Sequence, residues 1–387
     1  MRARLVFAVS ILAIVAGLVP GRSGALVSIT GPLCGTTDGA AADDTVTTLR
    51  VATFNLLHGL EETPDYPAHS TFDARLELQA HEIVNEALDL IGIQEASVTE
   101  RPDGHAPGNH VERLAARLAE LTGEAWHWCW HLSNPHFPIE PDIAPGGGGP
   151  LSDFMASMAS GNYGSFKEGA GVLSRYRIRK AEARRLPLRF PAEYVLCPPE
   201  GIPFCNLTAI FDHRIAMWAR VDTPGGLTDI IATHLAHGLT PLSDVSTFEQ
   251  AAAIIAFSEQ KTRQEGAPAR RFITCDCNVQ TTDLPPVVQL VTSAGWTDSY
   301  AFAHPDSACL PGQDTLGCTS HQDIVTETPE ATTHSRIDYV FARGDTCALE
   351  IAGSERIADT PSLRPDGTYL WPSDHLAVAT DIAIGGC

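Results

Sequence analysis

The sequence has few basic residues and lacks the cysteine spacing that marks a bound metal cluster. It contains 26 Lys and Arg against 47 Asp and Glu, which gives a formal net charge of −21. Such an excess of carboxylates repels phosphate backbones at long range and argues against a high-affinity nucleic-acid binder. It does not exclude a nuclease, because bound cations reverse the local sign of the charge. No Cys-x-x-Cys pair and no internal repeat occurs.

An apolar run over residues 5–19 lies between the basic start MRAR and a small-residue site at Ser23, Gly24 and Ala25. This combination is typical of a secretory signal peptide. The run is shorter than the ~20 residues that cross a bilayer, which disfavours a membrane anchor. We therefore expect a signal peptide over residues 1–25 and a secreted, extracellular protein.

The rest of the chain shows one composition regime and fits one domain. Residues 26–46 resemble a linker, so we expect a flexible N-terminus of the mature chain there. Residues 47–387 are expected to fold as a single domain. A glycine-rich stretch within residues 133–164 interrupts this domain, and we interpret it as a long surface insertion near the functional site.

The chain has 10 cysteines, and in an exported protein they indicate disulfides. Cys275 and Cys277 flank Asp276. On a strand the two cysteines share one face and Asp276 takes the other, so we expect two small buried side chains rather than a redox pair. The partners of these two cysteines, like those of Cys34, Cys129, Cys347 and Cys387, stay open. We expect two disulfides across short, turn-rich loops, Cys197–Cys205 and Cys309–Cys318.

Six short polar motifs each lie at an end of an apolar, strand-like run. Hairpins and interspersed helices predict an α/β fold of two mixed or antiparallel sheets packed face to face and flanked by helices. All six motifs would then meet at one edge. Trp126, Trp128 and Trp130 alternate with other residues, which favours packing between sheet and helix over a membrane-binding edge. The motifs are ATFNLLHG (52–59), GIQEA (92–96), ATHLAHG (232–238), TCDCN (274–278), SRIDYVF (335–341) and PSDH (372–375).

These motifs supply the residue types that hold a hard divalent cation. Hydrolysis of a phosphodiester needs a cation on a phosphoryl oxygen, a positioned water and donors for the charge of the transition state. Mg²⁺ prefers oxygen ligands and keeps several waters, so one or two carboxylates suffice, with Mn²⁺ or Ca²⁺ as alternatives. Glu95 is our first choice as a direct ligand. Asn55 would hold a carboxylate or water of the coordination shell, and Asp374 would be a second ligand or an outer acceptor.

The other motif residues suit the chemistry of attack by water. Asp276 would orient or deprotonate the water, and Asn278, two residues on, would donate to a phosphoryl oxygen. His375 would stabilise charge opposite the metal, kept protonated by Asp338. His234 would be a second donor, to phosphate or leaving group. Five other residues are left outside this predicted site. His58 and His237 are expected to face solvent, and only their position in the chain supports Asn162 and Lys167. Arg336 fits a phosphate contact or a surface salt bridge.

The motif set TFN, QE, THL, DCN, RIDY and SDH resembles the DNase I-like endonuclease/exonuclease/phosphatase superfamily over roughly residues 47–384. GAGVLSRY (169–176) also resembles the central strand of that family. Cys275 departs from the usual pattern, since DCN stands where the family has a Gly-Asp-x-Asn form. The resemblance implies a four-layer α/β sandwich with residues 47–387 as the catalytic domain. It implies that Glu95 binds metal supported by Asn55, that Asp276 and Asn278 serve the nucleophile and phosphate, and that Asp338 orients His375.

Three functions fit this pattern. The favoured one is a secreted, divalent-metal-dependent phosphodiesterase of the sphingomyelinase or phospholipase C kind, indicated by the histidine in ATHL, the secretion and the acidic charge. An extracellular DNase or RNase would share every catalytic residue. A non-catalytic binding module on the same fold is the third, although Glu95, Asp276 and His375 are all present. The expected partner is a phosphodiester, phospholipid or nucleic acid. No obligate protein partner is implied, and we expect a monomer.

Overall fold

The computed structural model describes residues 31–57, 71–98, 109–135, 167–187, 214–236, 241–279, 286–309, 316–320 and 323–384. The described residues all belong to one compact unit. The predicted signal peptide, the Cys197–Cys205 pair and nearly all of the predicted insertion lie outside the described residues. No helix among the described residues is long and apolar enough to cross a membrane.

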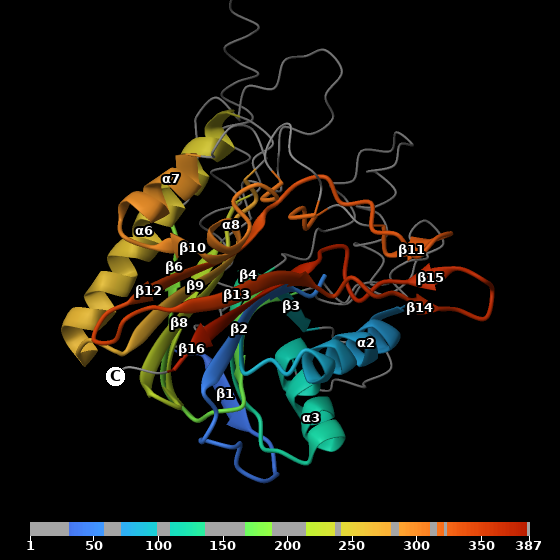
Figure 1. Cartoon of the computed structure of the whole chain (residues 1–387), viewed down its shortest axis with the longest axis horizontal. Coiled ribbons are helices and arrows are strands. Elements are labelled where there is room, and N and C mark those ends of the chain that lie inside the picture. Colours follow the sequence, from blue (N-terminus) through green and yellow to red (C-terminus); the bar gives the residue numbers. More distant parts are fainter. Residues whose placement is uncertain are drawn as a thin grey trace, which may run out of the picture. The chain divides into compact units, whose positions relative to one another are not determined.

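The first sheet has seven strands in the order β1-β4-β5-β3-β2-β16-β13 (Figure 1). Strands β2 and β3 are parallel, and the other neighbours are antiparallel. The strands are β1 (Leu33–Thr36), β2 (Thr48–Asn55), β3 (Leu90–Val98), β4 (His127–Pro135), β5 (Lys167–Ser174), β13 (Ile351–Ile357) and β16 (Ala377–Ala383).

The second sheet has six strands in the order β10-β12-β9-β8-β7-β6. Here β8 and β9 are parallel and the other neighbours are antiparallel. A small third sheet pairs β11 (Val325–Thr326), β15 (Tyr369–Leu370) and β14 (Ser362–Leu363). The strands of the second sheet are β6 (Ile178–Arg185), β7 (Ile215–Thr223), β8 (Gly226–His234), β9 (Arg270–Asp276), β10 (Thr297–Asp298) and β12 (Asp338–Gly344).

Four helices cover the outer faces of the two large sheets. Helices α2 (Phe72–Asn85) and α3 (His110–Thr122) pack on the first sheet, and α6 (Pro241–Glu265) and α7 (Pro286–Ser293) pack on the second (Figure 1). A short helix, α8 (Ser299–Ala303), follows β10. The order helix, sheet, sheet, helix is the predicted four-layer α/β sandwich.

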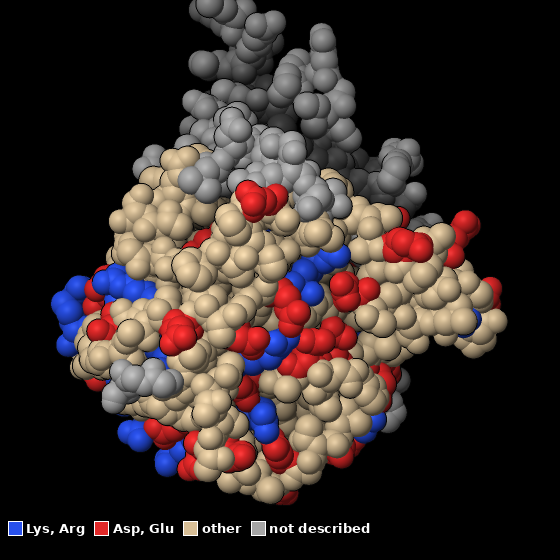
Figure 2. Space-filling model, viewed as in Figure 1, with Lys and Arg blue, Asp and Glu red and all other residues tan. Residues whose placement is uncertain are grey.

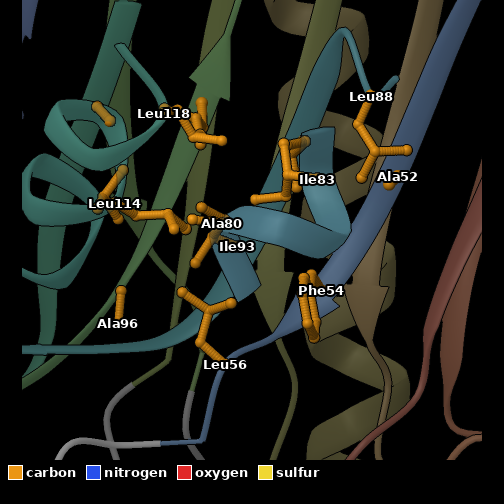
Figure 3. Close-up of a cluster of buried hydrophobic side chains, with 14 of the residues drawn as sticks. Ala52, Phe54, Leu56, Ala80, Ile83, Leu88, Ile93, Ala96, Leu114 and Leu118 are labelled. Atoms are coloured by element: carbon orange, nitrogen blue, oxygen red, sulfur yellow. The ribbon is translucent and has the colours of Figure 1, made fainter. Parts of the chain in front are cut away.

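The alternation of apolar residues along the strands separates three cores. In β2, Ala52 and Phe54 face α2 and α3, whereas Leu49 and Val51 face the second sheet. Successive side chains of a strand point to opposite faces, so one apolar strand serves two layers. Figure 3 shows Phe54 together with helix residues such as Ile83 in the core beneath α2 and α3. Trp126, Trp128 and Trp130 are all buried in this same core, as predicted.

The N-terminal segment differs from the prediction of a flexible stretch over residues 26–46. Residues 33–36 form β1, which pairs antiparallel with β4. Cys34 on β1 is bonded to Cys129 on β4, so the disulfide ties this strand to the sheet edge. This part of the segment belongs to the fold because paired backbone groups and a cross-link replace solvent contacts.

Gly92 in β3 marks a close approach of the two sheets. A Cβ atom at this position would lie 1.7 Å from the Thr274 side-chain oxygen on β9. Nearby, Gln94 Nε2 donates to the Thr274 carbonyl oxygen at 3.4 Å across the interface. The missing side chain therefore lets β3 and β9 pack closely just before the residues that carry the site.

Candidate active site

One edge of the sandwich collects polar residues from both sheets. Strands β2, β3, β8 and β9 end there, and their neighbours β5, β7, β12 and β16 run antiparallel and begin there. The register places His234 beside Asp276 and Asp276 beside Asp338. The residues gathered at this edge are Asn55, Glu95, Glu168, Arg214, His234, Asp276, Asn278, Asp338, Asp374 and His375.

Glu95 reaches the site through an irregularity in β3. The pairing of β3 with β5 shifts register between Ile93 and Ala96, and Glu95 has a left-handed backbone with φ 55°. A bulge of this kind re-aims a side chain, and a non-glycine residue at positive φ costs about 1 kcal/mol or more. Leu57 and Asn278 also have positive φ values, 52° and 49°. Three strained residues thus lie within one cluster.

Asn55, at the end of β2, links the side chains of Glu95 and Asp276. Its Nδ2 donates to Glu95 Oε1 at 3.0 Å and to Asp276 Oδ2 at 2.8 Å. Its Oδ1 accepts from the Leu57 backbone N–H at 3.0 Å, which fixes which way the amide points. Asn55 is fully buried. It therefore joins a carboxylate from each sheet, and its support of a bound metal stays a prediction.

Asp276 lies at the centre of the cluster. Its Oδ2 is 3.4 Å from His234 Nε2 and 3.9 Å from His375 Nε2, in addition to the bond from Asn55. Its Oδ1 accepts from the Asn278 backbone N–H at 3.1 Å, which closes a tight turn after β9. Cys275 and Cys277 are both buried, as predicted, and they are bonded to each other, a pairing that the sequence left open. Extended geometry holds them apart, but the chain bends at this turn.

His375 and Asp338 form a buried pair. His375 Nδ1 donates to Asp338 Oδ2 at 3.0 Å, which leaves Nε2 facing Asp276. Burial acts to lower the pKa of His375, but Asp338, Asp374 and Asp276 raise it well above its ordinary value. Burial raises the pKa of Asp338 to about 6, although His375 opposes this. The neighbouring carboxylates therefore favour the protonated form of His375, which is the state that its predicted role requires.

Thr319 joins the segments that carry this pair. Its Oγ1 accepts from the backbone N–H groups of Ile337 and Asp338, at 3.2 and 3.3 Å. Its carbonyl oxygen accepts from the Leu376 N–H at 2.6 Å. The neighbouring Cys318 is bonded to Cys309, the disulfide predicted from the loop length. Thr319 thus fixes the backbone on both sides of the imidazolium.

His234 contacts two residues that the sequence did not single out. Its Nδ1 lies 2.8 Å from a guanidinium nitrogen of Arg214 and 3.3 Å from Glu168 Oε1, while Nε2 lies 2.8 Å from Asn278 Nδ2. Burial and Arg214 act to lower the pKa of His234, but Asp276 and Glu168 outweigh them and raise it. Each ring nitrogen faces one donor and one carboxylate, an arrangement suited to a group that gains and loses a proton.

Asp374 directly precedes His375 and acts on that ring through its charge. Its charge contributes to the raised pKa of His375 and acts on the buried guanidinium of Arg75. Two groups of side chains place ligand atoms within 4.8 Å of one another, namely Glu95 with His234 and Asp276, and Asp276 with Asp338 and His375. Asp374 belongs to neither, so its predicted role as a ligand stays a prediction.

The site's charges fit a bound divalent cation. The named carboxylates are Glu95, Glu168, Asp276, Asp338 and Asp374, and the guanidiniums that act on them are those of Arg75 and Arg214. Buried carboxylates of like charge repel one another unless a cation lies among them. Carboxylate oxygens are also the donors that Mg²⁺ prefers.

The remaining candidates divide between buried and undescribed residues. Arg336 makes neither a phosphate contact nor a surface salt bridge, because it is buried and binds Asp298 with both terminal nitrogens at 2.9 and 2.8 Å. His58, His237, Asn162 and the side chain of Lys167 lie outside the described residues.

Comparison with known proteins identifies the fold. No protein-family model matches the sequence, and no curated protein is similar to it in sequence. Solved structures do match. An endonuclease/exonuclease/phosphatase from Beutenbergia cavernae is 22% identical, with a TM-score of 0.51 over 88% of this chain and 72% of that chain. A family protein from Bacteroides thetaiotaomicron is 16% identical, with a TM-score of 0.53 over 87% and 95%.

A mannosyl-6-phosphatase from Bacteroides thetaiotaomicron is 15% identical, with a TM-score of 0.52 over 87% of this chain and 99% of that chain. These matches span both sheets, and the motifs named from the sequence meet at one sheet edge. The chain therefore has the fold of the DNase I-like endonuclease/exonuclease/phosphatase superfamily, as its motifs predicted.

Proposed function

We propose that this protein is a divalent-metal-dependent phosphoesterase that hydrolyses a phosphodiester by attack of water. The position of Asp276 carries the proposal. A single carboxylate oxygen lies within 4 Å of two imidazoles, His234 and His375, and accepts a hydrogen bond from the amide that also holds Glu95. A base, two proton-bearing rings and an acidic ligand in one cluster suit hydrolysis of a phosphate ester.

Glu95 would hold the cation, Mg²⁺ in the first instance and Mn²⁺ or Ca²⁺ as alternatives, with Asn55 keeping its carboxylate in place. When bound, the cation supplies positive charge to a phosphoryl oxygen. Arg75 lies behind this position, and its charge acts on Glu95.

The chain's own residues supply the proton transfers. Asp276 accepts a proton from the attacking water, and the backbone turn at Asn278 holds that carboxylate in place. The imidazolium of His375 donates to an oxygen that gains charge in the transition state. His234 gives a proton to the leaving oxygen and lies 3.4 Å from Asp276, which can return one. The hydroxyl of the water is thereby added to the phosphate, and a proton is added to the leaving alcohol.

We further propose a phospholipid headgroup as the substrate, as in sphingomyelinase or phospholipase C activity. The excess of acidic residues supports this choice over nucleic acid. Figure 2 shows acidic and basic side chains interspersed over one face, with no continuous basic surface among its coloured residues. Secretion is part of the proposal, and it is supported by disulfides at Cys34–Cys129, Cys275–Cys277 and Cys309–Cys318.

An activity panel tests this function. Sphingomyelin vesicles, phosphoinositides, plasmid DNA, RNA and a sugar phosphomonoester are each incubated with the protein in Mg²⁺ and in EDTA. We expect EDTA-sensitive release of phosphocholine or an inositol phosphate. Cleavage of DNA or RNA alone replaces the lipid proposal with a nuclease, and no EDTA-sensitive turnover on any substrate favours a binding module and contradicts the proposal.

A further inference from the structure

The disulfide between Cys275 and Cys277 encloses Asp276. Cys275 is in β9 and Cys277 follows the strand, with only one residue between them. Both sulfur-bearing side chains are buried in the core between the second sheet and helices α6 and α7. The carboxylate of Asp276 points the other way, toward Asn55 and the two histidines. The cross-link therefore joins the backbone immediately before and after the central carboxylate.

The cross-link matches a bend in the chain. Two residues of an extended strand lie about 6.6 Å apart, at roughly 3.3 Å per residue. The Cα atoms of Cys275 and Cys277 are 5.1 Å apart. The strand is thus shortened at Asp276, and Asn278, two residues later, has a left-handed backbone. Without the cross-link, only the hydrogen bonds of this segment would hold the bend.

Hydrogen bonds on either side make this bend part of the site. The Leu235 N–H donates to the Asp276 carbonyl oxygen at 2.9 Å, and the Cys277 N–H donates to the Ile337 carbonyl oxygen at 2.7 Å. These contacts connect the bend to His234 and Asp338, the neighbours of Leu235 and Ile337. A shift of the backbone at residues 276–278 would therefore displace the base relative to both imidazoles.

We propose that the Cys275–Cys277 disulfide is a positioning element for Asp276 and Asn278. It holds the bend that sets the base against its partners, and it adds little to global stability. The proposal rests on the proposed function. The stabilisation that a disulfide gives rises with the logarithm of the loop length that it closes, so a separation of 2 residues contributes less than the separation of 95 in Cys34–Cys129.

The proposal is tested by removing the Cys275–Cys277 and Cys34–Cys129 disulfides in separate variants. The variants C275A/C277A and C34A/C129A each lose one cross-link, and only the first adjoins the site. We measure kcat and KM on the best substrate of the panel, the melting temperature, and the Mg²⁺ dissociation constant by isothermal titration. We expect C275A/C277A to lose tenfold or more in kcat with KM within about threefold and a small change in melting temperature. C34A/C129A should melt clearly lower and keep its kcat.

Full kcat in C275A/C277A overturns the proposal, and so does a loss of kcat in both variants that follows their melting temperatures. Failure of the proposed function is recognised separately, because the wild-type protein would then show no EDTA-sensitive turnover. In that case the Mg²⁺ titration decides. Weaker binding in C275A/C277A than in C34A/C129A supports positioning, and equal binding in both overturns it.

Discussion

At the scale of single residues, the charge state of His375 depends on its neighbours. Burial alone would leave the ring neutral, whereas Asp338, Asp374 and Asp276 raise its pKa well above the ordinary value. A raised histidine pKa gives stability that is complete below the unfolded value near 6.5 and is lost as pH rises through the folded pKa. The imidazolium therefore persists to higher pH than that of an ordinary histidine.

We expect Asp338→Asn to move the alkaline limb of kcat/KM to lower pH. The amide removes the charge that most raises the pKa of His375, so the ring loses its proton earlier. Profiles measured over about pH 5 to 10 should show the shift. Asp381→Asn, on the same strand as the residues after His375 but paired with Arg50, should leave the limb in place. An unmoved limb in Asp338→Asn contradicts the assigned pair.

The sequence correctly predicted that polar residues at the ends of strands lie close together. Asn55, His234 and Asp276 follow apolar runs, and the structure brings them together. Sequence-based prediction failed for Arg336, since a basic residue gives no sign of a buried carboxylate such as Asp298, which is 38 residues away. It placed Cys275 and Cys277 correctly as buried residues but could not assign their pairing, because the period-two rule assumes an extended chain and the chain bends there.

At the scale of helices and strands, the residues missed by the sequence precede strands instead of following them. Glu168 is near the start of β5, and Arg214 comes just before β7. Both strands run antiparallel to strands that end at the site. Pairing partners must be known before such residues can be recognised. The one local signal is their position beside GAGVLSRY and the predicted hairpin.

Helix α2 supports the site from behind. Arg75 donates to the carbonyl oxygens of Leu56 and Leu57 at 2.9 and 3.2 Å, and Gln79 Nε2 donates to Leu56 and Pro372 oxygens at 2.9 and 2.8 Å. These bonds join the segment after β2 to the segment before His375. A spacing of four residues puts Arg75 and Gln79 on the buried stripe of the helix, a signal readable in the sequence.

We expect Arg75→Met to lower the free energy of unfolding by about 3 kcal/mol. The reason is that the buried carbonyl oxygens of the segment after β2 lose a hydrogen-bond donor and the nearby carboxylates lose the positive charge of the guanidinium. Urea titration measures the change. Arg113→Met is the matched control on α3, where the ion pair with Asp73 is mostly exposed and worth about 0.5 kcal/mol. Equal effects in the two variants would show that Arg75 does not support this region.

Gly92→Ala tests the close approach of the two sheets. Its methyl group would collide with Thr274, so we expect a loss of about 1–3 kcal/mol in the free energy of unfolding. Gly353→Ala on β13 is the control, since an added Cβ there lies no closer than 3.7 Å to another group. A Gly92 variant as stable as the Gly353 variant would contradict the packing described for β3 and β9.

At the scale of the whole molecule, the site lies at one edge of the sandwich and takes residues from both sheets. The first sheet and its adjoining segments carry Asn55, Glu95 and His375. The second sheet carries His234, Asp276 and Asp338. The sequence predicted this arrangement because each of the six motifs lies at one end of a predicted strand. It could not predict the bulge at Glu95 or the left-handed turns, since these depend on how the two sheets fit together.

Metal binding should therefore stabilise the whole sandwich. A cation at one hundred times its dissociation constant adds about 2.7 kcal/mol to the free energy of unfolding. We expect Mg²⁺ to raise the melting temperature of the wild-type protein and EDTA to reverse the rise. Glu95→Gln should show little of this rise, and Glu120→Gln, on the exposed side of α3, should show all of it. The same rise in melting temperature in both variants would show that Glu95 does not bind the cation.

The central claim is that Asp276 and His375 perform metal-assisted hydrolysis of a phosphodiester. The most direct measurement is kcat/KM of Asp276→Ala and His375→Ala on the best substrate in Mg²⁺, with circular dichroism and melting curves to verify folding. Asp366→Ala, in the exposed turn before β15, is the control. The account predicts folded variants with activity lowered by about a thousandfold or more and a control close to wild type. Undiminished turnover in either site variant would contradict the mechanism.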